Sequence, residues 1–235
     1  MTFTGDRFVK VPSIKDAETS AKYFRPYLGK LVDYRAENMA DRVTFRPLRQ
    51  DLANLLLSTG KKRFRVLDVG AGPLTTLGCL MNGVSLEIVP VDALAGWYDC
   101  ILADAGIDPP VKTIFGIMET LDLQFGPDIF DLAFSENAID HCHDPMTALN
   151  AMMFVTKPGG WIACECYANE GEANKYNVFH QWNICEDGGR LVLWGKDKNR
   201  WDIANGLGAV ETKIRMKDNG RGSLPVIEFM LRKPE

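Results

Sequence analysis

One short stretch of the sequence gathers side chains that could transfer protons. It contains, in direct succession, Asp140, His141, Cys142 and His143. An imidazole titrates near working pH and a neighbouring carboxylate can orient it, so His141 together with Asp140 is a candidate general base. The alternative candidate is His180, the third and last histidine of the chain. We therefore take Asp140, His141 and His180 as the candidate catalytic residues.

The same stretch could also be read as a metal site. Its possible ligands are Asp140, His141 and His143, but such a site usually needs a further ligand that the local spacing does not supply. Cys164 and Cys166 lie two apart on an expected strand and lack the Cys-x-x-Cys spacing of structural zinc. Because buried free cysteine behaves as a small hydrophobe, we expect six reduced thiols and no metal.

A second stretch, Gly70-Ala71-Gly72, exposes bare backbone directly after an apolar run that contains Asp68. Such a loop lets a ligand approach closely, and Pro73 can begin a helix whose free N–H groups point at that ligand. At the carboxyl end of a parallel strand this loop binds either a dinucleotide or S-adenosylmethionine. Thr75 stands where the dinucleotide pattern has its third glycine, and Asp68 favours S-adenosylmethionine.

A parallel sheet must position these residues. Short β-type runs predict strands over Arg65–Val69, Leu86–Val91, Val111–Phe115, Phe130–Phe134 and Trp161–Cys166. Helical patterns between them cover Thr75–Met81, Ala93–Ala105 and the segment that opens at Asp144-Pro145. This alternation predicts an α/β fold with helices on both faces of the sheet. Alternation over residues 210–217, a turn at Asp218-Asn219-Gly220 and a strand over Val226–Leu231 predict a closing hairpin.

The first part of the chain reads differently from the rest. Residues 14–60 predict two or three helices, with leucines at helical spacing after Pro47 and a stop at Gly60. We expect residues 1–60 to form a helical cap packed on the main domain, residues 61–235, within one structural unit. The sequence shows no repeats, low-complexity tract or long linker.

Composition limits the classes of partner. A net charge of −4 and a pI near 5.5 provide no basic field for nucleic acid or an anionic membrane surface. The first residues lack the apolar core of a signal peptide, and no apolar run approaches the roughly 20 residues of a membrane span. We expect a cytoplasmic protein that binds neither nucleic acid nor membrane, and the sequence does not indicate its oligomeric state.

Several motifs occur together in the order of one known family. They are "LDVGAG" at 67–72, "VPVDAL" at 89–94, "FGIMETL" at 115–121, "FDLAFSENAIDH" at 130–141 and "VTKPGGWIACE" at 155–165. Over residues 65–166 the chain thus resembles the class I S-adenosylmethionine-dependent methyltransferases. The resemblance implies a Rossmann-like, seven-stranded, mostly parallel sheet with an antiparallel terminal strand. One departure is Leu74, which replaces the third glycine of the usual G-x-G-x-G motif.

The resemblance also implies a set of cofactor-binding residues. Asp68 would help to hold the methionine ammonium group of S-adenosylmethionine, and Asp92 would accept bonds from both ribose hydroxyls. A purely structural role is the alternative for each: Asp68 could cap the glycine turn, and Asp92 could cap the following helix. The full set carried over by matching motifs is Asp68, Gly70, Ala71, Gly72, Asp92, Ala93, Met118, Glu119, Ser135 and Asn137.

For this family we expect a small-molecule acceptor. The candidate base at Asp140 and His141 favours a hydroxyl oxygen, on a sugar or natural-product-like molecule, narrowly over the nitrogen of a small amine. Two different functions stay open as well: a nicotinamide-dependent oxidoreductase, and a protein that binds the cofactor without turnover. The aromatic segment 176–201, which includes His180, is either a satellite core or a lid over the acceptor.

Overall fold

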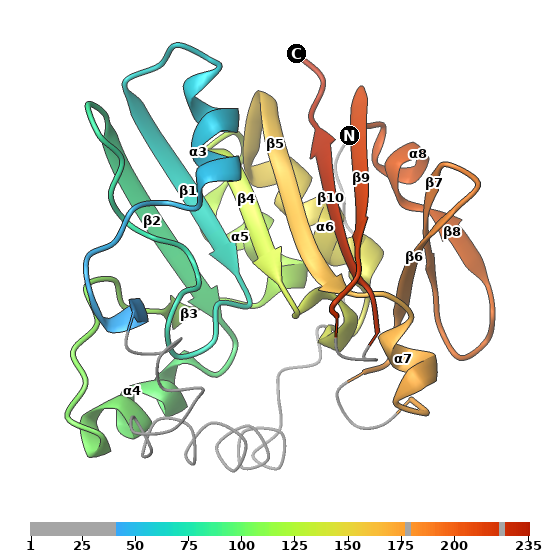
Figure 1. Ribbon diagram of the computed structural model, residues 1–235, viewed down its shortest axis with the longest axis horizontal. Helices are drawn as coiled ribbons and strands as arrows, with labels where there is room; N and C mark the ends of the chain where they lie inside the picture. The colour runs from blue at the N-terminus through green and yellow to red at the C-terminus, as the bar shows by residue number, and fades with distance from the viewer. Residues whose placement is uncertain (1–40, 177–179, 221–223) are drawn as a thin grey trace.

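Seven strands form one sheet in the order β3-β2-β1-β4-β5-β10-β9 (Figure 1). The structure is a computed structural model that describes residues 41–176, 180–220 and 224–235. The strands are β1 (Arg63–Val69), β2 (Ser85–Asp92), β3 (Ile114–Phe115), β4 (Phe130–Glu136), β5 (Thr156–Tyr167), β9 (Glu211–Lys217) and β10 (Val226–Arg232). The first five run parallel, and β10 is antiparallel to both of its neighbours. The predicted Rossmann-like sheet and its closing hairpin are confirmed.

Helices cover both faces of this sheet. On one face, Leu52 and Leu56 of α3 (Gln50–Leu57) share a buried cluster with Val66 and Phe134 of the central strands. On the other face, α6 (Pro145–Val155) packs against the alternate residues of the same strands, such as Leu67 and Ala133. The short helix α5 (Leu121–Phe125) lies beside α6 (Figure 1). Central strands that are buried on both sides read as the continuous apolar runs from which they were predicted.

The start of α6 follows its predicted signal. The Asp144 carboxylate accepts hydrogen bonds from the backbone N–H groups of Met146 and Thr147, at 3.1 and 3.2 Å. Pro145 occupies the first turn, where its missing N–H leaves no helical bond unmade. The predicted helix after residue 93 is also present, as α4 (Ala95–Asp104).

The predicted helix over Thr75–Met81 is wrong, and no helix begins at Pro73. The segment instead runs beside residues 46–48: the N–H groups of Cys79 and Leu80 both donate to the Arg46 carbonyl, and Leu48 donates to the Leu80 carbonyl. These bonds to a distant segment replace the local bonds of a helical turn. The glycine loop is therefore not followed by a helix N-terminus that could face a ligand.

Gly78 makes this pairing possible. A Cβ added there would lie 1.8 Å from the Pro47 carbonyl oxygen, which belongs to rigid backbone. We expect Gly78→Ala to lower the free energy of unfolding by about 1–3 kcal/mol, the usual cost of overpacking. Gly96→Ala is the matched control, because nothing lies within 4 Å of its added Cβ. Urea titration of both variants measures the difference, and equal stability would contradict the close approach.

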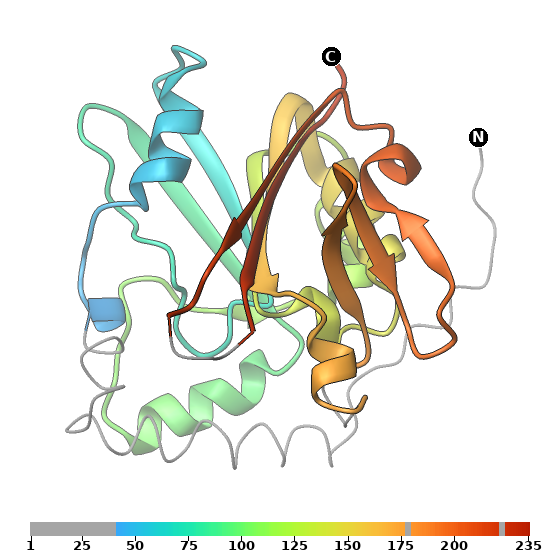
Figure 2. The same cartoon turned by 45° about the vertical axis from the view of Figure 1, so that its right-hand side comes forward.

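The aromatic segment forms a second, three-stranded sheet that was not predicted. Its strands are β6 (Asn183–Asp187), β7 (Arg190–Trp194) and β8 (Arg200–Asp202), between the helices α7 (Glu170–Ala173) and α8 (Ile203–Leu207). Figure 2 shows this sheet beside the β9–β10 hairpin. Ile184, Leu191 and Leu193 are buried in the same core as α6, so one face of the segment belongs to the main core and does not form a separate satellite core.

Three further expectations concern the cysteines, membrane-spanning helices and the helices before residue 60. All six cysteines are described and carry free thiols, with Cys142, Cys164 and Cys166 buried. Within the described residues, no helix has the length and apolar character to cross a membrane. Of the helices predicted between residues 14 and 60, α3 is present, and everything before residue 41 lies outside the described residues.

Candidate active site

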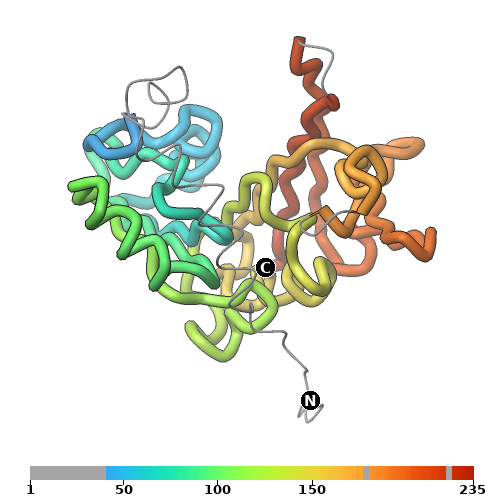
Figure 3. Tube along the Cα trace, turned by 90° about the horizontal axis from the view of Figure 1, so that it is seen from below, coloured from blue at the N-terminus to red at the C-terminus, as the bar shows by residue number. Residues whose placement is uncertain are grey.

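The glycine loop lies where β1, β2 and β4 end, on the edge of the sheet seen in Figure 3. Gly70 and Gly72 have φ of 72° and 66°, a left-handed conformation that favours glycine. The N–H groups of Gly70 and Ala71 donate to the Val91 carbonyl at 2.9 and 3.1 Å, which ties the loop to β2. A Cβ on Gly70 would lie 2.3 Å from the Cβ of Ala138, so the loop also contacts the segment after β4.

Asp92 at the end of β2 holds the loop in place. Its carboxylate accepts the N–H of Gly72 at 3.0 Å and the N–H of Leu94 at 2.9 Å, and Tyr98 donates its hydroxyl as well. Burial raises the pKa of Asp92, and the two backbone donors oppose this shift. A carboxylate has about four acceptor positions. The structure therefore leaves room for one ribose hydroxyl more readily than for two. The predicted alternative that Asp92 caps the following helix is wrong, because its bond to Leu94 lies ahead of α4, whose N-terminus has no side-chain cap.

Asp68 is a buried carboxyl group on β1, 2% exposed. The hydroxyl of Thr75 donates to it, but burial prevails and raises the pKa of Asp68 to about 7. The carboxylate of Glu136 raises this pKa further, whereas Arg42 lowers it. An ammonium group placed beside Asp68 would favour the charged carboxylate. The site thus suits the cationic end of the expected cofactor.

Other predicted cofactor residues divide into two groups. The methyl group of Met118 lies 3.4 Å from the Cβ position of Gly70, and the hydroxyl of Ser135 donates to the Val69 carbonyl at the end of β1. Both therefore border the loop. Ala93 directly follows Asp92 after the end of β2.

Glu119 and Asn137 have structural partners instead. Glu119 accepts the backbone N–H groups of His143 and Asp144, at 2.7 and 3.3 Å, and so supports the start of α6. Asn137 adopts a left-handed φ of 49° and donates its N–H to the Glu165 carbonyl on β5. Its backbone fixes the turn that follows β4.

Thr113 is a loop contact that no sequence pattern predicts. Its buried hydroxyl donates to the Gly72 carbonyl at 2.8 Å. A single threonine before a short strand carries no distinguishing sequence signal, because its partner is 41 residues away.

The candidate catalytic residues do meet, and we call Asp140, His141 and His180 the His–Asp cluster. The Asp140 carboxylate oxygen Oδ2 lies 2.7 Å from Nδ1 of His180 and 3.5 Å from Nε2 of His141. The two imidazole nitrogens are 3.1 Å apart. Asp140 is buried at 1% exposure, while His141 and His180 are partly open to solvent.

Two long-range bonds place His180 in the His–Asp cluster. The N–H of Gln181 donates to the Asp140 carbonyl at 3.2 Å, and the indole N–H of Trp182 donates to the Cys142 carbonyl at 3.1 Å. The aromatic segment therefore starts against the turn after β4.

The electrostatic environment of the two histidines differs. Burial of its ring lowers the pKa of His141, against the effect of the Asp140 carboxylate. Burial would also lower the pKa of His180, but the hydrogen bond to Asp140 and the negative charges of Glu170 and Asp140 outweigh it and raise the pKa. Burial and the Asp140 charge raise the pKa of Glu170 to about 7. The carboxylates of Asp140 and Glu170 thus favour a positive charge at the position of the His180 ring.

Three other residues of the candidate region lie outside the His–Asp cluster. Asp144 caps α6, and Glu165 forms an ion pair with Arg49 at 3.0 Å. The side chain of His143 is exposed, as expected. These three therefore have other partners or face solvent.

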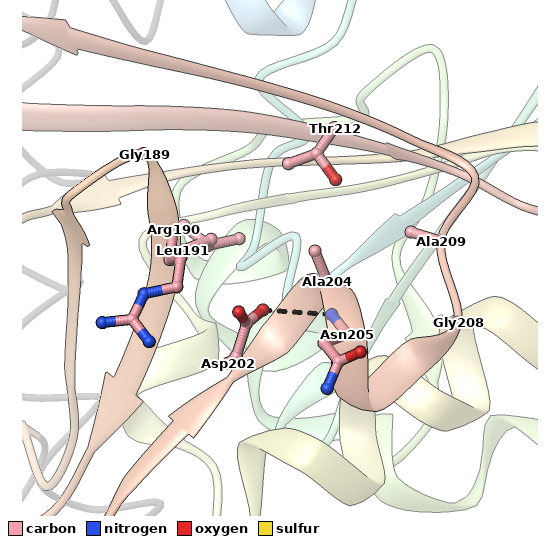
Figure 4. A pocket seen from close by; sticks show the side chains of 9 residues that line it. All are labelled: Gly189, Arg190, Leu191, Asp202, Ala204, Asn205, Gly208, Ala209 and Thr212. Carbon is pink, nitrogen blue, oxygen red and sulfur yellow. Dashed lines mark hydrogen bonds between the residues drawn. The ribbon is translucent and has the colours of Figure 1, made fainter.

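A pocket of about 360 Å³ lies away from the loop, between β7, α8 and the start of β9 (Figure 4). It is lined by Gly189, Arg190, Leu191, Asp202, Ala204, Asn205, Gly208, Ala209 and Thr212. Its acidic residue, Asp202, accepts the N–H of Asn205 at the start of α8. This carboxylate is thus already part of a helix cap.

Comparison with known proteins agrees with this geometry. A family model described as a methyltransferase domain matches residues 67–164. A demethylmenaquinone methyltransferase of Mycolicibacterium paratuberculosis is 30% identical over 129 residues, which cover 50% of this chain and 54% of the relative. A ubiquinone biosynthesis O-methyltransferase of Paraburkholderia phymatum is 31% identical over 110 residues, which cover 44% of this chain and 43% of the relative. The chain spans about half the length of these curated relatives.

A solved structure shows the same fold. The CurJ carbon methyltransferase aligns with a TM-score of 0.53 at 9% identity, covering 94% of this chain and 71% of that one. The matched family model begins in β1 and ends in β5, so it spans both the glycine loop and the turn that carries Asp140 and His141. Nothing in these matches supports a nicotinamide-dependent oxidoreductase. Residues 67–164 are therefore similar to a methyltransferase domain, and the fold around them is the Rossmann-like sheet that the resemblance to class I S-adenosylmethionine-dependent methyltransferases predicted.

Proposed function

We propose that the protein transfers the methyl group of S-adenosylmethionine to a hydroxyl oxygen of a small molecule. Gly70, Ala71 and Gly72 form the backbone cradle of the cofactor, Asp68 faces its methionine ammonium group, and Asp92 accepts a ribose hydroxyl. The left-handed loop and the buried carboxyl of Asp68 support this placement. When bound, the cofactor supplies a sulfonium methyl that is already a strong electrophile.

The His–Asp cluster is the observation that carries the choice of oxygen. A neutral amine can attack a sulfonium methyl unaided, whereas an alcohol needs help in losing its proton. Asp140 and His141 of the cluster stand on the turn after β4, and Ala138 of the same turn contacts Gly70. We therefore assign to Asp140, His141 and His180 the removal of the hydroxyl proton as the oxygen–carbon bond forms and the carbon–sulfur bond breaks.

The relatives support a small acceptor. The names of two of them concern quinone compounds, and one is an O-methyltransferase. A sugar or natural-product-like alcohol is the finer part of the proposal. The net charge of −4 favours such a neutral acceptor over nucleic acid.

The test is methyl transfer by the purified full chain from methyl-labelled S-adenosylmethionine. Phenols, sugars and small amines are offered as separate pools, and labelled product is identified by mass spectrometry. We expect label on a hydroxyl oxygen, and His180→Asn should lose this product while His143→Asn keeps it. Label on amines alone would make the protein an N-methyltransferase. Cofactor binding without product from any pool would favour a protein that binds the cofactor without turnover.

A further inference from the structure

Three polar atoms of the His–Asp cluster lie close to one another. Asp140 Oδ2, His141 Nε2 and His180 Nδ1 are separated by 2.7, 3.1 and 3.5 Å. One proton on His180 Nδ1 can make one strong hydrogen bond, to Asp140 or to His141. A cation can satisfy all three atoms at once.

The same distances fit metal coordination. The circle through the three atoms has a radius of about 1.8 Å, so a point about 1 Å above their plane lies about 2.1 Å from each, the usual zinc–ligand distance. The angles at that point are about 80° to 115°, which suits three ligands on one side of a cation with open positions opposite.

A second observation concerns the other oxygen of Asp140. Oδ1 is buried and lacks a hydrogen-bond partner among the residues that the structure describes, although Asp140 is only 1% exposed. A buried carboxylate with an unpaired oxygen is costly unless a cation compensates its charge. Asp140 therefore has the environment of a metal ligand.

We propose that Asp140, His141 and His180 bind one divalent transition-metal cation. Two imidazole nitrogens and one carboxylate oxygen suit zinc, iron(II) or cobalt(II), whereas magnesium and calcium prefer all-oxygen sites. Sequence spacing suggested His143 as the ligand beside Asp140 and His141. The fold supplies His180 in its place.

This inference rests on the proposed function and changes one step of it. Side chains that bind a cation cannot also accept the proton, so the cation, rather than the side chains directly, promotes loss of the hydroxyl proton. The acceptor hydroxyl occupies an open position on the cation, which makes its proton more acidic. The proton passes to solvent water, the oxygen bonds to the methyl carbon, and the carbon–sulfur electron pair stays on sulfur as S-adenosylhomocysteine leaves.

The test is cobalt(II) binding by the full chain after treatment with a chelator. We expect one equivalent to bind and to give visible absorption bands from coordinated cobalt(II). His141→Asn and His180→Asn should each weaken binding at least 100-fold, whereas His143→Asn, on the same loop, should bind like the wild type. Circular dichroism confirms that each variant is folded, and two variants are used because either could fail to fold.

Two results overturn the cation site. One is wild-type protein that binds no cobalt(II); the other is unchanged binding in folded His141→Asn and His180→Asn. Methylation assays of metal-free and zinc-reconstituted protein separate this inference from the proposed function. One bound cation without hydroxyl methylation would refute only the function, and full methylation without any bound cation would refute only the cation site.

Discussion

Gly70→Val is expected to weaken S-adenosylmethionine binding at least 100-fold. An added Cβ would lie 2.3 Å from the Cβ of Ala138, and a β-branched residue is strained at the φ of 72°. The loop must move to relieve this contact, and this movement would break the hydrogen bonds from its N–H groups to the Val91 carbonyl on β2. Isothermal titration calorimetry of the variant and the wild type measures the loss.

Gly83→Val separates the effect of the contact with Ala138 from the effect of backbone strain. Gly83 has nearly the same φ, 73°, but nothing lies within 4 Å of its added Cβ. It therefore carries the backbone strain without the collision, and we expect it to bind the cofactor as the wild type does. Binding by folded Gly70→Val within threefold of wild type would show that the loop does not border the cofactor.

Asp68→Asn is expected to change stability and cofactor binding in opposite directions. Burial holds the pKa of Asp68 near 7 in the folded protein, against 3.8 for the free group. The folded state thus binds the extra proton, and wild-type stability falls as the pH rises from 4 to 7. Asparagine does not titrate, so the stability of the variant relative to wild type should rise over this window by about 4 kcal/mol at most.

Cofactor binding should respond the other way. Loss of a charged partner for the methionine ammonium group is expected to weaken affinity about 10- to 100-fold at pH 8. Urea titrations at pH 5 and pH 8 give the stability, and calorimetry gives the affinity. A pH-independent stability difference would mean that Asp68 is ionised in the folded protein throughout this range.

Asp51→Asn provides a control of opposite sign. Burial alone would raise the pKa of Asp51, but the hydrogen bond and charge of Arg49 outweigh it and lower that pKa. This carboxylate therefore stabilises the fold above pH 4, and the contribution is lost as the pH falls. Its replacement should make the variant relatively less stable as the pH rises to about 4, the reverse of Asp68→Asn, and should give a constant stability difference between pH 5 and pH 8.

Local sequence patterns determined the sheet and the glycine loop. The central strands are buried on both faces and so appear as apolar runs, and Asp144-Pro145 begins α6 through contacts within one turn. Gly70 and Gly72 occupy left-handed positions that depend on their own backbone. These features could be predicted because the interactions that cause them lie within a few residues.

Only the tertiary structure decided which distant groups meet. The segment over Thr75–Met81 has a helical pattern, yet its N–H groups bond to Arg46, and Gly78 fits against Pro47. His180 lies 39 residues beyond His141, and the small sheet that begins after it brings their rings together. Burial, which raises the pKa of Asp68 to about 7, likewise arises from packing between distant segments. No local pattern predicts such contacts, because their energy depends on how elements that are far apart in the sequence pack against one another.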